Sequence, residues 1–151
     1  MDRKLAAILT LTVGVLAAAP AWAAFENVMV SPRARAMGDA GVAVPDAAFA
    51  SYLNPAGLAE QDRQGSVGLS YVRPPGLAFH NLYYAGAAFR LPDGAGNLGV
   101  GFRQYAVEYQ DVDLQTESTL TLAHGTHLYE DLHSSVAVGY GVNFYRLEFG
   151  E

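Results

Sequence analysis

Cysteine is absent from this chain of 151 residues, and positive charge is scarce. Without cysteine no disulfide can staple the fold, so stability has to come from buried surface or from a membrane. Nine basic residues stand against fifteen acidic ones, which gives a net charge of −6. Because no basic stripe is present to bind a phosphate backbone, we expect no nucleic-acid partner.

The N-terminus has the organisation of a secretory signal peptide. Two basic residues precede an apolar run over Leu5–Ala19, and a small-residue cleavage site follows at residues 21–23. The alternative is an uncleaved membrane anchor, but the run is shorter than the ~20 residues that a spanning helix needs. We predict that residues 1–23 are removed before Ala24 and that the chain is exported.

The remaining sequence divides into two regions of different texture. Residues 24–64 are rich in alanine, glycine and turn formers, whereas residues 65–151 read as successive strands. In the first region residues 47–53 predict a short helix with Asp46 as its N-cap, and a following proline ends it. The sequence Asn-Pro-Ala-Gly at 54–57 predicts a type I turn.

The second region predicts antiparallel strands, because bulky apolar residues alternate with small or polar ones at a period of two. The expected strands are Gly65–Arg73, His80–Arg90, Asn97–Val107, Thr116–His127 and Ser134–Phe149. In the second strand the pattern places Leu82 and Tyr84 on the bulky side, opposite Ala85 and Ala87. Each strand therefore has one bulky apolar side and one small or polar side.

Strand length favours a barrel in lipid, since soluble strands usually have ~5–6 residues and tilted membrane strands have ~9–11. Tyrosines near the strand ends fit an aromatic girdle, with the bulky side facing lipid and the small side facing the lumen. A secreted β-sandwich is the alternative. The connections at 91–96 and 129–132 are short, and we expect the longer acidic stretch 108–117 to form an exterior loop.

Five strands do not close a barrel, because single-chain barrels use even numbers from ~8 upward and lipid tolerates no unpaired edge. We predict that residues 65–151 are the first five strands of an incomplete barrel, within a longer chain or an assembly of several chains. The predicted fold class is all-β, the N-terminal portion of a transmembrane antiparallel β-barrel preceded by a short helical or irregular hatch over residues 24–64.

The stretch from Arg33 to Ala59 resembles the N-terminal segment of the PorV/PorQ family, which is related to FadL-type outer-membrane transporters of hydrophobic compounds. That pattern has an Arg-Ala and Met-Gly-Gly-Ala beginning, then an Asp among small residues, and an Asn-Pro-Ala-Gly-Leu ending. The matching positions are Arg35, Ala36, Met37, Gly38, Ala40, Asp46, Asn54, Pro55, Ala56, Gly57 and Leu58. The sequence departs from the pattern at Asp39, where glycine is usual.

The resemblance implies that residues 24–64 fold into the lumen as a hatch. The implied hatch-motif residues are Arg35, Gly38, Gly41, Asp46, Asn54, Pro55 and Gly57. The implied contacts to a hydrophobic ligand are Met37, Phe49, Tyr52 and Leu53. The implied location is the outer membrane of a Gram-negative bacterium, with outer-membrane lipid and lipopolysaccharide as partners, together with a hydrophobic small molecule or an exported protein.

No arrangement of side chains predicts catalysis. His124 and His127 are three residues apart, so a strand points them to opposite faces and a shared metal would need a bend. The acidic residues around Asp113 lack the glycine of a calcium loop, because Thr116 occupies that position. We therefore expect no enzyme activity, no cofactor and no metal.

Three functions are consistent with these patterns. The leading hypothesis is an outer-membrane channel, gated by the hatch, for passive transport of hydrophobic small molecules. The alternative is a protein-binding barrel that acts as a shuttle in type IX-like secretion. A second alternative is a secreted β-sandwich with a structural role.

Overall fold

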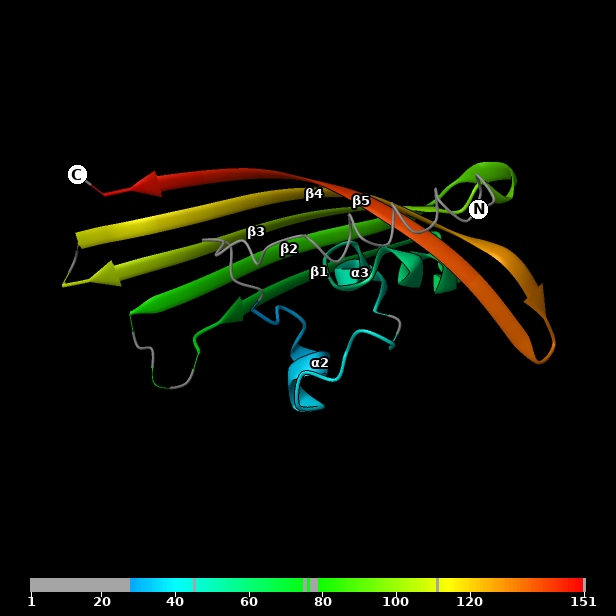
Figure 1. The fold of residues 1–151 in the computed structure, drawn as a ribbon, viewed down its shortest axis with the longest axis horizontal. Helices are drawn as coiled ribbons and strands as arrows, with labels where there is room; N and C mark the ends of the chain where they lie inside the picture. Colours follow the sequence, from blue (N-terminus) through cyan, green and yellow to red (C-terminus); the bar gives the residue numbers. More distant parts are fainter. Residues whose placement is uncertain (1–27, 45, 75, 77–78, 111, 151) are drawn as a thin grey trace, which may run out of the picture.

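One five-stranded antiparallel sheet, preceded by short helices, makes up the fold, and this sheet is not closed into a barrel (Figure 1). A computed structural model describes residues 28–150 apart from positions 45, 75, 77, 78 and 111. The predicted signal peptide, residues 1–23, lies outside the described residues.

The strands pair with their sequence neighbours in the order β1 to β5, and every pairing is antiparallel. Their bounds are β1 Gly65–Val72, β2 His80–Arg90, β3 Asn97–Tyr109, β4 Val112–Asp131 and β5 Ser134–Phe149. The outermost strands, β1 and β5, each have one pairing partner among the described residues. The predicted antiparallel sheet is confirmed, and its place in a barrel stays a prediction.

The acidic stretch at 108–117 is not a loop, so this prediction is wrong. β3 continues to Tyr109 and β4 begins at Val112, so the two strands form a tight hairpin. Gln110 turns the chain with a φ of 52° in the left-handed region. Val112 and Leu114 alternate with polar residues at a period of two. This alternation fits a strand, so the acidic stretch forms part of the sheet.

Loop length does not distinguish the two ends of the sheet, although the sequence indicated that it would. β4 continues to Asp131, so the connection predicted at 129–132 is mostly strand. Longer connections occur at 73–79 and 91–96, which lie at opposite ends of the sheet. Each end therefore has one tight turn and one longer connection.

The two faces of the sheet differ in the way that the alternation predicts. Large apolar side chains cover what we call the outer face, and they are exposed. They include Val67, Leu69, Leu98, Val100, Phe102, Leu120, Leu122, Val142 and Phe144. The opposite, inner face has glycine, small and polar residues at the alternating positions, and the N-terminal helices cover it.

The second strand departs from its predicted orientation. Leu82 and Tyr84 are buried on the inner face, at 1% and 3% exposure, whereas Ala85 and Ala87 lie on the outer face. The structural reason is that Leu82 and Tyr84 form part of the apolar core together with Phe49 of the preceding helix. Alternation shows that a strand has two faces, but it does not show which face points toward the core. The predicted orientation of β2 was therefore wrong, because large side chains fill the core on the inner face there.

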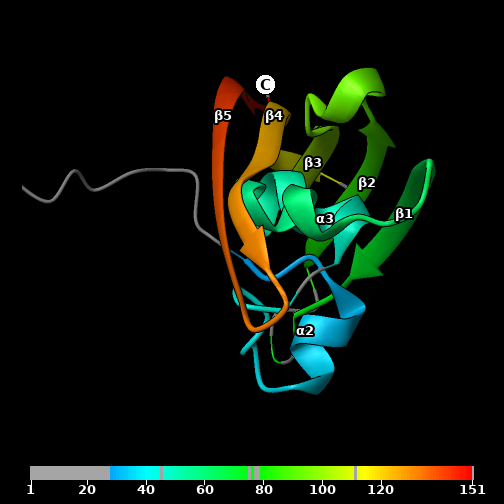
Figure 2. The same ribbon diagram turned by 90° about the vertical axis from the view of Figure 1, so that its right-hand side faces the viewer.

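Residues 28–64, which we call the N-terminal segment, lie in the concavity of the inner face (Figure 2). The segment contains α2 Pro32–Ala36, α3 Ala47–Leu53 and the 3-10 helix η1 Pro55–Glu60. α3 and η1 contact all the strands between them, and α2 lies farther toward one end (Figure 2). The apolar core therefore lies between this segment and the sheet, with Leu58 completely buried.

Candidate functional site

The corner between α3 and η1 is fixed by the side chain of Asn54. Its Oδ1 accepts a hydrogen bond from the Ala56 amide at 3.2 Å, and its Nδ2 donates to the Val42 carbonyl at 3.1 Å. The Gly57 amide donates to the Asn54 carbonyl at 2.9 Å, which closes the predicted turn. The chain then continues as η1 instead of passing directly into β1.

Asp46 occupies the predicted N-cap position of α3, but its carboxylate does not cap that helix. It accepts a hydrogen bond from the Ser31 hydroxyl at 2.8 Å instead. The same Ser31 oxygen accepts from the Ala34 amide at 3.2 Å and so caps α2. Asp46 therefore connects the starts of the two helices, and it holds the N-terminal segment together.

Glycines of the inner face allow α3 and η1 to approach the strands at backbone distance. A Cβ atom at Gly86 would lie 2.0 Å from the carbonyl oxygen of Ala48. A Cβ atom at Gly139 would lie 2.2 Å from the amide nitrogen of Ala56. Neither distance is possible for a side chain, so these positions require glycine for space. The N-terminal segment therefore packs directly against the small residues of the inner face.

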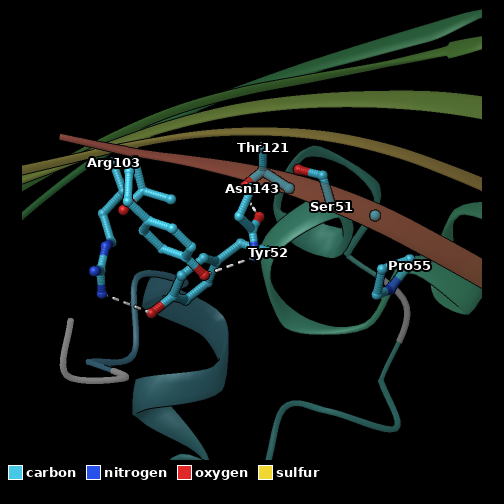
Figure 3. Close-up of a pocket in the computed structure, with 9 residues that line it drawn as sticks. Ser51, Tyr52, Pro55, Arg103, Thr121 and Asn143 are labelled. Carbon is cyan, nitrogen blue, oxygen red and sulfur yellow. Dashed lines mark hydrogen bonds between the residues drawn. The ribbon is translucent and has the colours of Figure 1, made fainter. Parts of the chain in front are cut away.

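A polar pocket of about 340 Å³ opens between the α3–η1 corner and strands β3 to β5 (Figure 3). Its lining residues are Ser51, Tyr52, Pro55, Arg103, Thr119, Thr121, Gly141, Asn143 and Tyr145. Seven of the nine carry hydroxyl, amide or guanidinium groups, and the labelled ones come from α3, η1 and strands β3 to β5 (Figure 3). The pocket is therefore suited to binding the polar part of a molecule.

Arg103 and Tyr52 join the N-terminal segment to the sheet at one side of this pocket. Nη1 of Arg103 donates to the Tyr52 hydroxyl at 3.1 Å, and the guanidinium carbon lies 5.5 Å from the centroid of the same ring. The Tyr52 hydroxyl in turn donates to the Val28 carbonyl at 3.2 Å. Burial raises the pKa of Tyr52, an effect that the nearby Arg103 opposes. The hydroxyl keeps its proton at neutral pH and can make both bonds.

The opposite wall is a short chain of hydrogen bonds across two strands. The Thr121 hydroxyl donates to Asn143 Oδ1 at 2.8 Å, and Asn143 Nδ2 donates to the Tyr145 hydroxyl at 3.0 Å (Figure 3). Thr119 is 3% exposed, and its hydroxyl has no hydrogen-bond partner among the described residues. That hydroxyl can both donate to and accept from a bound polar group.

Three of the four residues that were expected to contact a hydrophobic ligand lie together on α3 and pack in one apolar core, and Met37 lies apart from them. Tyr52 lines the polar pocket. Phe49 is buried and stacks on Tyr84, with 5.0 Å between the ring centroids. Leu53 packs at the edge of the same core, and Met37 lies 40% exposed after α2. These four side chains therefore do not form one apolar pocket in this arrangement.

The hatch-motif glycines have different structural roles. Gly38 and the following Asp39 have φ angles of 67° and 65°, in the region that favours glycine. Asp39 thus adopts the left-handed conformation without being glycine. A Cβ atom at Gly41 would lie 2.2 Å from that of Ala34, whereas one at Gly57 would have its nearest neighbour at 3.8 Å. Space therefore requires glycine at 41 but not at 57.

The two other motif residues lie apart from one another. Arg35 is half-buried in α2 and is not among the residues that line the polar pocket. Pro55 opens η1, where a missing amide hydrogen costs nothing, and it does line the pocket. Tyr52 and Pro55 are thus the predicted site residues that the structure brings to this pocket.

The alternation pattern placed Arg103, Thr119, Thr121 and Asn143 on the small or polar side but did not single them out. They meet because Arg103 pairs with Thr119 and Thr121 pairs with Asn143 across the strands. This register is set by the hairpin turns, and one of those turns was predicted as a long loop. The sequence signal that could have predicted the pocket was the polar character of inner-face positions on three neighbouring strands.

His124 and His127, the two histidines considered as metal ligands, contact backbone groups. His124 Nε2 lies 2.7 Å from the Ala95 carbonyl, and His127 Nε2 lies 3.0 Å from the Ala59 carbonyl. Within the part of the chain that the structure describes, no three acidic or histidine side chains gather as a metal site would require. None of the helices described is both long and apolar enough to cross a bilayer.

Comparison with protein-family models, with curated proteins and with solved structures finds no match to this chain.

Proposed function

We propose that the sheet is part of an outer-membrane β-barrel and that the N-terminal segment is its hatch, which gates the passive passage of hydrophobic small molecules. The outer face lies in lipid, and the inner face borders the lumen. The polar pocket holds the polar part of a passing molecule while α3 and η1 are displaced. The proposal assigns binding and passage to this site, without catalysis.

The observation that carries the proposal is the contrast between the two faces. Leu69 and Val67 on the outer face are 76% and 74% exposed, and the exposed apolar side chains continue across all five strands. Soluble proteins rarely expose an apolar patch of this extent. On the inner face the core is completed by the N-terminal segment. An apolar outer face of this kind is stable in contact with the acyl chains of a bilayer, which supports its placement in lipid.

The strands also have the dimensions of the proposed class. β2, β3, β4 and β5 contain 11, 13, 20 and 16 residues, and a tilted strand needs ~9–11 to cross a membrane. The edge strands β1 and β5 each have one side that no other described strand pairs with. Lipid does not tolerate such an edge, so the proposal includes further strands that close the sheet. A β-sandwich would need a second sheet, and the described residues form one.

Locking the hatch to the sheet tests this function directly. A Cβ atom at Gly101 would lie 2.9 Å from Ser51 Oγ, so Ser51→Cys with Gly101→Cys places two sulfur atoms within disulfide reach. The chain has no other cysteine. Cells expressing the protein should take up a labelled aromatic hydrocarbon, lose that uptake when the pair is oxidised, and regain it with a reductant.

The single variants Ser51→Cys and Gly101→Cys are the matched controls, and the uptake that each supports, whatever its level, should not differ between oxidising and reducing conditions. If the unmodified protein causes no uptake above cells without it, the channel is excluded. Co-purification with exported proteins in the absence of uptake would support the secretion shuttle instead.

A further inference from the structure

A narrow apolar groove runs over β2 on the outer face. Its floor is Ala85, and its walls are Leu69 on β1 and Phe102 on β3, the two cross-strand neighbours of Ala85. Tyr71 and Tyr83 close one end, with 5.1 Å between their ring centroids. The groove has a volume of about 410 Å³ and an almost wholly apolar lining. It arises because a small residue lies between two large ones.

A second small residue follows Ala85 on the outer face of β2. Ala87 is the next outer-face position of β2, and its cross-strand neighbours are Val67 and Val100. From Ala87 to Ala85 the small-residue floor rises roughly 7 Å, at ~3.4 Å per residue. Tyr83 and then Asn81 continue the same face for roughly 14 Å more. The floor therefore holds a short part of one acyl chain, and the part nearer the headgroup lies against the tyrosine rings.

A cation lies at the closed end of this groove. Asn81, which is 9% exposed, accepts through Oδ1 from the Tyr71 hydroxyl at 2.8 Å and from Nη2 of Arg73 at 3.2 Å. The Arg73 side chain is itself exposed, and no described carboxylate oxygen lies within 4.0 Å of it. The groove thus leads from apolar surface to aromatic rings and then to a positioned guanidinium.

We propose that this groove binds one anionic membrane phospholipid, with an acyl chain over Ala85 and Ala87 and the phosphate against Arg73. A guanidinium binds phosphate oxygens through paired hydrogen bonds, and tyrosine rings favour the level of lipid headgroups. A second copy docked here about a two-fold axis along the membrane normal would bring two Arg73 side chains to the same end of the contact, which disfavours that occupant. The inference rests on the proposed function, because the outer face must lie in lipid.

The charge is tested with the full chain inserted into vesicles of equal phosphatidylglycerol and phosphatidylcholine, followed by native mass spectrometry of the retained lipid. The unmodified protein should retain phosphatidylglycerol preferentially. Arg73→Gln should lower that preference about fivefold, as expected for one basic residue at an anionic surface. Arg146→Gln is the matched control, since Arg146 lies on the same face and contacts Glu148. It should leave the preference unchanged.

The shape is tested with Ala85→Phe, which fills the floor of the groove. Retention of both lipids should fall, whereas Val142→Phe, which adds bulk to the same face on β5, should leave it unchanged. Equal retention of the two lipids by the unmodified protein, or equal effects of each variant and its control, would overturn the inference. A protein that inserts but shows no preference refutes only this site, whereas one that does not float with the vesicles refutes the proposed function.

Discussion

Adjacent residues of one strand meet two different environments in this protein. On the inner face, Gly86 has the Ala48 carbonyl oxygen where its Cβ atom would be. The next residue, Ala87, lies on the outer face beside Val67, which is 74% exposed. At these two positions the inner face is constrained to the level of single atoms, whereas the outer face has room for a larger apolar side chain. A packed protein surface requires the first, and a fluid solvent permits the second.

The largest expected effect concerns a leucine of the inner-face core and a leucine outside that core. Leu58 of η1 is completely buried between the N-terminal segment and the sheet, and Leu132, in the turn between β4 and β5, is 89% exposed. Leu58→Ala should lower the free energy of unfolding by about 2–5 kcal/mol through lost burial and a residual cavity. Leu132→Ala should change it by less than about 0.5 kcal/mol. Urea unfolding from vesicles, followed by circular dichroism, measures both, and equal effects would mean that the segment does not pack as described.

An added positive charge should be more costly on the outer face than on the inner face. Val100→Arg puts a cation on the outer face and should lower stability in vesicles by about 2–4 kcal/mol. Asn143→Arg, in the lining of the polar pocket on the inner face, should cost less than about 1 kcal/mol if that face borders a water-filled lumen as proposed. The same unfolding experiment compares them. If Val100→Arg left the free energy of unfolding unchanged, the outer face would have to be in contact with water.

Added volume should be tolerated outside and rejected inside. Gly86→Val drives a side chain into the Ala48 carbonyl and should lower the free energy of unfolding by about 1–3 kcal/mol. Ala87→Val adds two methyl groups on the outer face and should stay within about 0.5 kcal/mol of the unmodified protein. Thermal unfolding of the two variants side by side checks this. A tolerated Gly86→Val would show that α3 can move off the sheet at little cost.

The smallest effect is expected at the α3–η1 corner. Asn54→Ala removes the acceptor for the Ala56 amide and the donor to the Val42 carbonyl, and should cost about 1 kcal/mol. Asn54→Asp keeps the acceptor and should lose about half as much. Hydrogen exchange at the Ala56 amide reports the local opening. Protection that is unchanged in Asn54→Ala would mean that the turn does not depend on this side chain.

Much of the fold follows from the local sequence, because alternation, caps and turns are local. The β2 and β5 bounds, the α3 helix and the Asn54 turn were predicted as observed. The hairpin at Gln110 was not predicted, because a residue other than glycine adopts the positive φ there and no usual turn residue occupies that position. The inward direction of Tyr84 was not predicted, because it depends on contacts with Phe49, which is distant in sequence. The polar pocket was missed for the same reason, since Arg103 reaches Tyr52 across 51 positions of sequence.

The most direct test of lipid on the outer face uses two neighbouring residues of β5. Val142 lies on the outer face, and Asn143 lines the pocket on the inner face. Because the chain has no cysteine, Val142→Cys and Asn143→Cys can each carry a single fluorescent label. In vesicles, nitroxide-bearing lipid should quench the label at 142 and leave the label at 143 to aqueous iodide. Quenching of both labels by iodide alone would contradict the account.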